Sequence, residues 1–290
     1  MSPEKALPIK SAVYKGPITD TDRWENFKPR ADDIFICTPP KCGTTWTQAI
    51  VAMLVFGTPD HGEQPGVISP WIDANFAPID DYLAQVDEQT HRRFIKTHTP
   101  LDGIPYFPEC QYLVVCRDPR DMYFSMQNHV DNMADEDLAA SVGGRSFDEW
   151  VDAALVSEDL DVQSIETATH FLQTYWDYRE LPNIHMFHYY DMKQDLRGHI
   201  AKTAEILGVS LTDTQLDAMT EAATFANMQA KGDQYAPGSG TGLWKKDAAF
   251  FATGKNSQWM DKLTHAQLDR FDARIRTLLN DEQRAWLLRS

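Results

Sequence analysis

The fold is indicated first by residues 34–46, which read IFICTPPKCGTTW. The apolar run 34–37 ends in a threonine and two prolines and is typical of a short buried strand. Gly43 and two threonines then open a helical stretch, residues 46–56, that is apolar on most of its faces. A strand that leads through a glycine-containing turn into a helix forms the first half of a β-α-β unit.

The same pattern recurs along the chain. Further strands are predicted at residues 93–96, 111–116 and 183–190. Helices are predicted from Asp118-Pro119 onward, over 164–179, over 191–207 with an end at Gly208, and over 264–288. Strands that are apolar throughout and alternate with helices predict an α/β fold, a single P-loop-type domain whose central parallel sheet is flanked by helices on both faces.

The chain divides into few parts. We expect an N-terminal surface segment at residues 1–30 and a single α/β domain over residues 31–290. Within that domain the acidic, helix-prone stretch 131–161 has the character of an insertion. We expect a lid or ligand-binding loop at residues 231–259, whose glycine-rich part, 232–242, can equally be a plain surface loop.

Composition excludes several kinds of function. The 290 residues carry 43 acidic and 27 basic side chains, a net charge of −16, and a nucleic-acid partner is not expected because it needs an electropositive face. No stretch approaches the ~20 apolar residues that span a bilayer, and the N-terminus lacks the apolar core of a signal peptide. The cysteine spacing fits neither a metal site nor a disulfide framework. We therefore expect a cytoplasmic protein with reduced thiols, no transmembrane segment and no metal.

The loop after the first predicted strand has the chemistry of an anion site. Backbone N–H groups at the start of a helix attract anions, and Lys41 and the hydroxyls of Thr44 and Thr45 add charge and donors. The pattern is not a Walker A motif, because the lysine precedes the glycine. An ordinary turn with a surface lysine is the alternative.

Two more loops carry candidate side chains. Lys96 and His98 end the second predicted strand, where ligands of open α/β sheets bind, and a histidine there can accept a proton from a hydroxyl. Arg117 ends the third strand, and Ser125 follows on the next helix as a second donor to a phosphate. His98 can equally be structural, and Arg117 can equally pair with Asp118 or Asp121.

Taken together and in order, these stretches resemble the cytosolic-type sulfotransferases that use 3′-phosphoadenosine 5′-phosphosulfate (PAPS), and we expect a bacterial member. Five patterns of the family occur here in order. They are YPKSGTTW at residues 38–46, KTHxP at 96–100, RNPxD with a later serine at 117–125, YEDMK at 189–193 and FxRKGxxGDW at 250–259. The five motifs span most of the chain.

The resemblance implies a role for each matching residue. The 5′-phosphosulfate would be held by Lys41, Thr44 and Thr45 and by the amides of Cys42 and Gly43. The adenine would contact Trp46, Tyr189 and Phe225. The 3′-phosphate would be held by Arg117 and Ser125, together with the turn at Gly254 and Lys255. His98 would be the general base, with Lys41 and Lys96 beside the transferring group as the other catalytic residues. PAPS would be the donor, 3′-phosphoadenosine 5′-phosphate (PAP) the product, and no metal would be needed.

The chain departs from the family at three places. Ala252-Thr253 replaces an Arg-Lys pair that would contact the 3′-phosphate, and Lys255 and Asn256 are the candidates to substitute for it. Cys42 replaces a serine and would set a thiol of lowered pKa beside the anion site. The family's dimer motif keeps only a threonine cleanly at residues 260–269, and a family-type dimer is not expected.

The expected reaction moves a sulfuryl group in line from PAPS to a hydroxyl of a phenol, an alcohol or a glycolipid. Aromatic residues at 70–76, Tyr106-Phe107 and the stretch 131–147 are candidates to line a pocket for a small-molecule acceptor with an apolar body, although they can equally pack the core. A P-loop kinase and a non-catalytic nucleotide-binding module are the rival interpretations.

Overall fold

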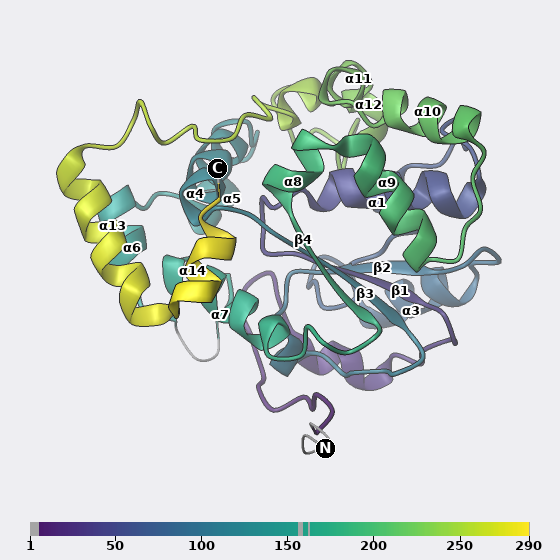
Figure 1. The fold of residues 1–290 in the computed structure, drawn as a ribbon, viewed down its shortest axis with the longest axis horizontal. Helices are drawn as coiled ribbons and strands as arrows, with labels where there is room; N and C mark the ends of the chain where they lie inside the picture. Colours follow the sequence, from purple (N-terminus) through teal and green to yellow (C-terminus); the bar gives the residue numbers. More distant parts are fainter. Residues whose placement is uncertain (1–5, 156–158, 162, 290) are drawn as a thin grey trace.

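The computed structural model describes residues 6–155, 159–161 and 163–289. At its centre four parallel strands lie in the order β2-β1-β3-β4 (Figure 1). Their bounds are β1 Ile34–Cys37, β2 Phe94–Thr97, β3 Gln111–Cys116 and β4 Ile184–His188. β1 is paired in parallel with β2 on one side and with β3 on the other. The loops that follow these three strands therefore begin at the same edge of the sheet.

Helices cover both faces of this sheet. They are α1 Thr44–Phe56, α2 Pro65–Ile68, α3 Ile79–Asp87, α4 Pro119–Asp131, α5 Glu136–Val142, α6 Phe147–Asp152, α7 Ile165–Trp176, α8 Tyr189–Gln194, α9 Leu196–Ile206, α10 Asp213–Ala222, α11 Phe225–Ala230, α12 Gly232–Tyr235, α13 His265–Leu278 and α14 Asp281–Leu287. Short 3-10 turns span Thr21–Asn26, Leu101–Gly103 and Asp247–Phe250. The predicted α/β fold with a central parallel sheet is confirmed.

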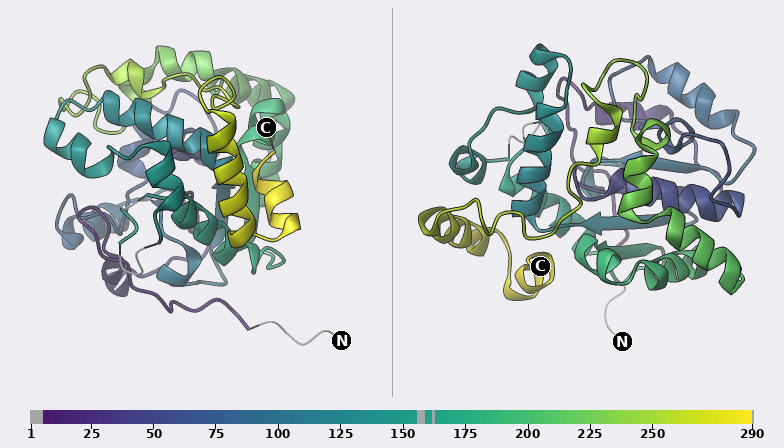
Figure 2. Two further views of the ribbon diagram at one scale, coloured as in Figure 1. Left: turned by 90° about the vertical axis from the view of Figure 1, so that its left-hand side faces the viewer. Right: turned by 90° about the horizontal axis from the view of Figure 1, so that it is seen from above.

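Alternate residues of each strand enter two separate cores, which explains why the strands are apolar throughout. Ile34 and Ile36 of β1 pack with α1, α9 and α10 on one face. Phe35 and Cys37 point to the other face, toward α7, α13 and the N-terminal segment. Figures 1 and 2 show α13 lying beside α6 at the end of the molecule remote from α10.

The predicted elements differ from the structure mainly at their ends. The strand predicted at 93–96 lies one residue later, and the one predicted at 183–190 stops at His188 because α8 begins at Tyr189. The helix predicted at 191–207 is divided into α8 and α9 by Asp195, whose carboxylate caps α9 by accepting from the Gly198 amide. The helix predicted at 264–288 is likewise divided, by a capping box at Asn280.

The N-terminal segment does not simply lie on the surface, because part of it is packed into the core. Trp24 and Phe27 are buried in the core beside Phe35. The Trp24 indole donates to the Asp73 carboxylate, which also accepts from the hydroxyls of Thr97 and Thr99. One buried carboxylate therefore fastens this segment to the end of β2.

The stretches 131–161 and 231–259 pack on each other. α5 and α6 form the helical part of the first stretch, whose residues 156–158 lie outside the described residues. Met133 of the first stretch packs with Ala236 and Trp244 of the second, and a β-bridge joins Met133 to Trp244. Residues of both stretches lie beside the edge of the sheet at which β1, β2 and β3 end.

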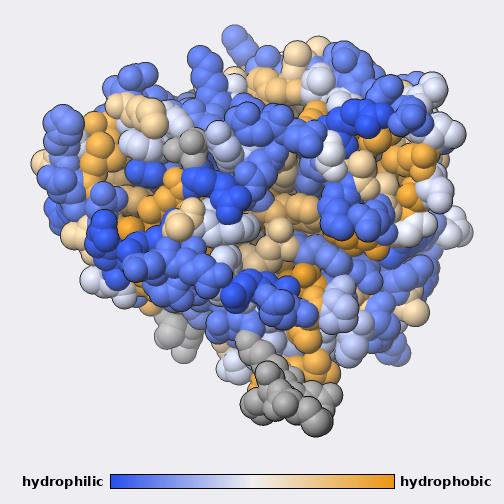
Figure 3. Space-filling model, in the orientation of Figure 1, coloured by the Kyte–Doolittle hydropathy of each residue, from blue (hydrophilic) through white to orange (hydrophobic). Residues whose placement is uncertain are grey.

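The outer surface is mainly hydrophilic on the face drawn in Figure 3, in keeping with the large net charge. Among the described residues, no helix is both long enough and apolar enough to cross a membrane.

A buried ion pair clamps the starts of β1 and β2. The Arg93 guanidinium donates to both carboxylate oxygens of Asp33 at 2.8 and 2.5 Å, and both side chains are inaccessible to solvent. Asp33→Ala leaves the buried Arg93 charge with only the exposed Asp87 carboxylate, 3.3 Å from its Nη1. Because that partner is largely solvated, we expect the free energy of unfolding to fall by about 3–5 kcal/mol in denaturant titrations. Arg197→Ala, which removes an exposed pair with Asp213 and Asp217, should cost far less. Equal losses in the two variants would contradict this account.

Candidate active site

A cavity of about 900 Å³ opens where β1, β2 and β3 end. Of the site residues expected from the sequence, it is lined by Lys41, Gly43, Thr44, Thr45, Trp46, Lys96, His98, Arg117, Ser125, Tyr189, Phe225 and Gly254. Cys42 and Lys255 do not line it. Segments far apart in the sequence therefore share one chamber.

The loop between β1 and α1 is shaped by two left-handed residues. Lys41 and Gly43 have φ values of 68° and 96°. A side chain at position 43 would also meet the Tyr189 ring at 3.0 Å, which leaves glycine as the residue that fits. Thr44 then starts α1, and its hydroxyl lies 2.6 Å from that of Thr38. The first-turn amides of this 13-residue helix have no intrahelical partners and suit an anion.

Lys41 makes a contact that the sequence did not suggest. Its Nζ donates to Nδ1 of His129 at 2.9 Å and lies 4.9 Å from the centre of the Phe250 ring. Burial, with the charges of Arg117 and Lys96 nearby, lowers the pKa of Lys41 to about 7. His129 lies one helical turn beyond Ser125 on α4, and that four-residue spacing was the available signal that both face the same cavity.

The ring of His98 is oriented by the main chain. Its Nδ1 lies 2.7 Å from the Thr38 carbonyl oxygen, which can only accept, so the hydrogen bond assigns the ring proton to Nδ1 and the free lone pair to Nε2. Burial and the neighbouring Lys96 lower the pKa of His98 to about 3. The Trp71 ring packs against the imidazole at 4.7 Å between centroids. The site therefore holds a neutral histidine with one open nitrogen.

Lys96 stands over the face of the same indole, with its Nζ 4.6 Å from the Trp71 ring centre. Burial lowers its pKa to about 8, against the opposing effect of Asp73. Two lysines and a histidine thus meet in one chamber, although the chain as a whole is strongly acidic.

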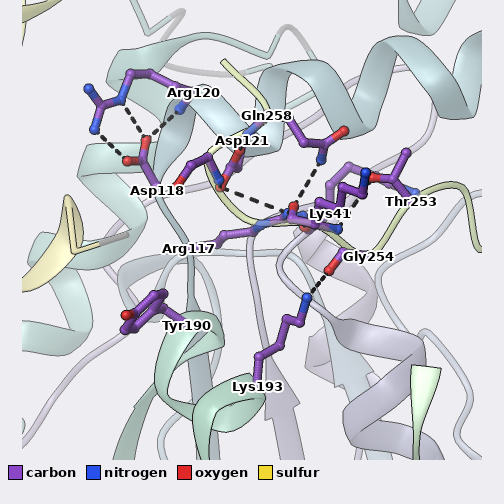
Figure 4. A network of polar contacts seen from close by, with 12 residues as sticks. Lys41, Arg117, Asp118, Arg120, Asp121, Tyr190, Lys193, Thr253, Gly254 and Gln258 are labelled. Carbon is purple, nitrogen blue, oxygen red and sulfur yellow. Dashed lines mark hydrogen bonds and ion pairs between the residues drawn. The ribbon is translucent and has the colours of Figure 1, made fainter. Parts of the chain in front are cut away.

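Arg117 is 4% exposed, and its guanidinium does not form the hydrogen bonds that cap the start of α4. The Asp118 carboxylate is taken by Arg120, and both oxygens of Asp121 accept from the amides of Ser257 and Gln258 (Figure 4). Arg117 instead donates to the carbonyls of Lys41 and Lys255 at 3.3 and 2.7 Å. Among the described residues, its Nε has no hydrogen-bond partner.

Aromatic side chains form a slot beside Arg117. The guanidinium lies 4.3 Å from the Tyr189 ring centre, and Tyr189 meets Trp46 edge-on at 5.5 Å. The Trp46 indole is fixed by donating to the Ala223 carbonyl at 2.8 Å. Phe225 lines the same part of the cavity and lies directly under Gly254. These rings give this part of the cavity an aromatic lining.

The sequence matches the sulfotransferase domain family model over residues 31–283. This chain belongs to the sulfotransferase family. It is 33% identical over 303 residues to a glycolipid sulfotransferase of Mycobacterium tuberculosis, an alignment that covers 94% of this chain and 93% of the relative. The chain is therefore a sulfotransferase enzyme.

Solved structures share this fold. A mouse sulfotransferase complexed with PAP superposes with a TM-score of 0.68 at 18% identity, over 91% of this chain and 90% of that one. Retinol dehydratase in a complex with retinol and PAP gives a TM-score of 0.70 at 19% identity, over 89% and 84%. These likenesses confirm the P-loop-type α/β architecture of this sulfotransferase.

Two expectations about this sulfotransferase need correction. The Cys42 side chain is fully buried behind Met122 and Ala168, which line the cavity, and burial raises the pKa of its thiol to about 12. The expected low-pKa thiol is wrong, because desolvation outweighs the helix start. Lys255 offers its carbonyl to Arg117, while its side chain is exposed outside the cavity.

The remaining half of the cavity is mostly apolar. Trp71 and Phe76 from the stretch 70–76, and Met133, Leu138 and Val142 from the stretch 131–147, line it as expected. Tyr106 and Phe107 do not, because their rings stack on Tyr112 and Phe35 in the core. Within the described residues, no cluster of three or more histidine, cysteine, aspartate or glutamate side chains could hold a metal.

The state of His98 can be observed directly. Because the pKa of His98 is lowered to about 3, the ring should stay neutral, with its proton on Nδ1, at pH 5, where a histidine of ordinary pKa is mostly charged. Long-range ¹H–¹⁵N correlation spectra of the sulfotransferase, with the signal assigned through His98→Asn, measure both properties. A charged His98 at pH 5, or a proton on Nε2, would show that the Thr38 carbonyl does not orient the ring.

Proposed function

We propose that this sulfotransferase transfers a sulfuryl group from PAPS to a hydroxyl of a phenol, an alcohol or a glycolipid by in-line displacement, with His98 as the general base. The observation that carries the proposal is the Nδ1 bond of His98 to Thr38, which leaves Nε2 free in the cavity shared with Lys41 and Lys96. A non-catalytic nucleotide-binding module would need no such base.

The residues around the cavity fit the donor. The start of α1 and Lys41 provide a site for the phosphosulfate. The rings of Trp46 and Tyr189 provide one for the adenine, and the Arg117 guanidinium provides one for the 3′-phosphate. The two similar structures named above contain PAP. The turn at 252–255 closes the side of the cavity next to Arg117.

In the reaction, the acceptor O–H bond breaks and its proton passes to Nε2 of His98 as the new O–S bond forms. The bond between sulfur and the 5′-phosphate oxygen breaks, so that PAP and a sulfate monoester are released. Negative charge grows on the leaving oxygen, where the Lys41 ammonium, once freed from His129, stabilises it more in the transition state than in the ground state.

The acceptor is a small molecule with an apolar body, because Trp71, Phe76 and Met126 are among the apolar side chains that border the His98 end of the cavity. The mycobacterial relative is named a glycolipid sulfotransferase and retinol dehydratase was solved with retinol, which supports acceptors of this class. We place the reaction in the cytoplasm, where the four free cysteines would stay reduced, and expect no family-type dimer.

Transfer itself is tested with ³⁵S-labelled PAPS and a panel of phenols, sterol-like alcohols and glycolipids. His98→Ala should lower the turnover of any accepted substrate by about 10²–10⁴-fold, because the base is lost, while the affinity for PAP changes little. His185→Ala is the matched control, since His185 bonds Gln111 and does not line the cavity. Full turnover in His98→Ala would refute the assigned base.

Binding of PAP should depend on pH through Lys41. With its pKa lowered to about 7, Lys41 carries its charge below that pH and loses it above, so binding an anion at higher pH requires uptake of a proton. We expect PAP affinity to fall between pH 7.5 and 9 by up to about tenfold per pH unit for each proton taken up. Calorimetric titration of Lys41→Arg, whose guanidinium stays charged, should give a smaller slope. The same slope in both proteins would contradict this assignment.

A further inference from the structure

The 3′-phosphate end of the proposed donor site lacks a pair of cations. The family resemblance of the sequence implies an Arg-Lys pair at positions 252 and 253, where this chain has alanine and threonine. The short side chains of Ala252 and Thr253 line the cavity without adding a charge. Arg117 alone would meet a phosphate dianion there. Lys255, the substitute suggested by the sequence, points its side chain to solvent outside the cavity.

Lys193 lies at the rim of this end of the cavity. It comes from the last turn of α8, four residues after Tyr189, so both face the same side of the helix. Its Nζ donates to the Gly254 carbonyl, one residue before the carbonyl that accepts from Arg117. Figure 4 shows the Lys193 ammonium group reaching the Gly254 carbonyl at this turn.

The charges around this turn are not balanced. Arg117 and Lys193 bring two cations, and burial, then the charge of Arg117, lowers the pKa of Lys193 against the opposing effect of Asp121. The nearest acid is Asp121, which lies 4.0 Å from Arg117 and already accepts from the amides of Ser257 and Gln258. Arg117 thus meets two neutral carbonyls and the Asp121 carboxylate, and Lys193 donates to one neutral carbonyl. The buried Nε of Arg117 has no hydrogen-bond partner among the described residues.

We propose that Lys193 binds the 3′-phosphate of the donor together with Arg117, in place of the missing Arg-Lys pair. The inference rests on the proposed function. A phosphate monoester carries close to two negative charges near neutral pH, and charge-assisted hydrogen bonds to it are stronger than those to a neutral carbonyl. Ser125 lines the same cavity from α4 and adds a hydroxyl donor.

The test compares PAP with AMP, which lacks only the 3′-phosphate, by calorimetric titration of the full chain. Lys193→Ala should bind PAP about 10–100-fold more weakly, the loss expected for one hydrogen bond to a charged group, with its affinity for AMP nearly unchanged. Lys193→Arg keeps the charge and should restore most of the preference. Lys202→Ala is the control for the loss of a lysine, because Lys202 is exposed on α9 and pairs with Glu205.

Two results would overturn the inference. Lys193→Ala could keep the preference of the unaltered protein for PAP, or Lys255→Ala could lose it while Lys193→Ala does not. Failure of the proposed function looks different, because then the unaltered protein itself would bind AMP as tightly as PAP. Equal melting temperatures of the lysine variants would confirm that binding is compared between equally folded proteins.

Discussion

The parallel hydrogen bonding of β1 to both β2 and β3 is the constraint on which the cavity depends. It sets three loops at one edge of the sheet, so that His98 from the end of β2 can bond the Thr38 carbonyl at the end of β1. The same pairing brings Arg117, at the end of β3, within reach of the Lys41 carbonyl. His98 and the basic side chains of the cavity are thus positioned by main-chain geometry more than by contacts with one another.

Electrostatics in this cavity oppose those of the whole molecule. The chain carries a net charge of −16, yet Lys41, Lys96 and Arg117 line a single chamber. Desolvation lowers the pKa of both lysines, and the charges of Arg117 and Lys96 lower that of Lys41 further. An anionic ligand relieves the repulsion at Lys41, so a protein with an acidic surface has a local site that suits anions. His98 stays neutral in the same field and keeps its lone pair.

Many features of the site could be predicted because they are local or carried by recognisable motifs. The four strands, the cap of α4 by Asp118 and the cluster of loops at the strand ends follow from apolar runs, turn residues and helix-start signals. Lys41, His98 and Arg117 were found through their place after predicted strands. The divisions at Asp195 and Asn280 were missed because an internal cap resembles an ordinary polar residue within a helical pattern.

The sequence alone determined the α/β class, the sulfotransferase resemblance and the loops that carry the polar groups. Only the tertiary structure decided which way side chains in those loops point: Cys42 turns into the core, Tyr106 and Phe107 stack within it, and His129 meets Lys41. It also placed Lys193 at the cavity rim and Lys255 outside the cavity, although both side chains are exposed. The reason is physical. Strand, turn and cap preferences depend on near neighbours in the chain, whereas burial and orientation depend on residues brought close by folding.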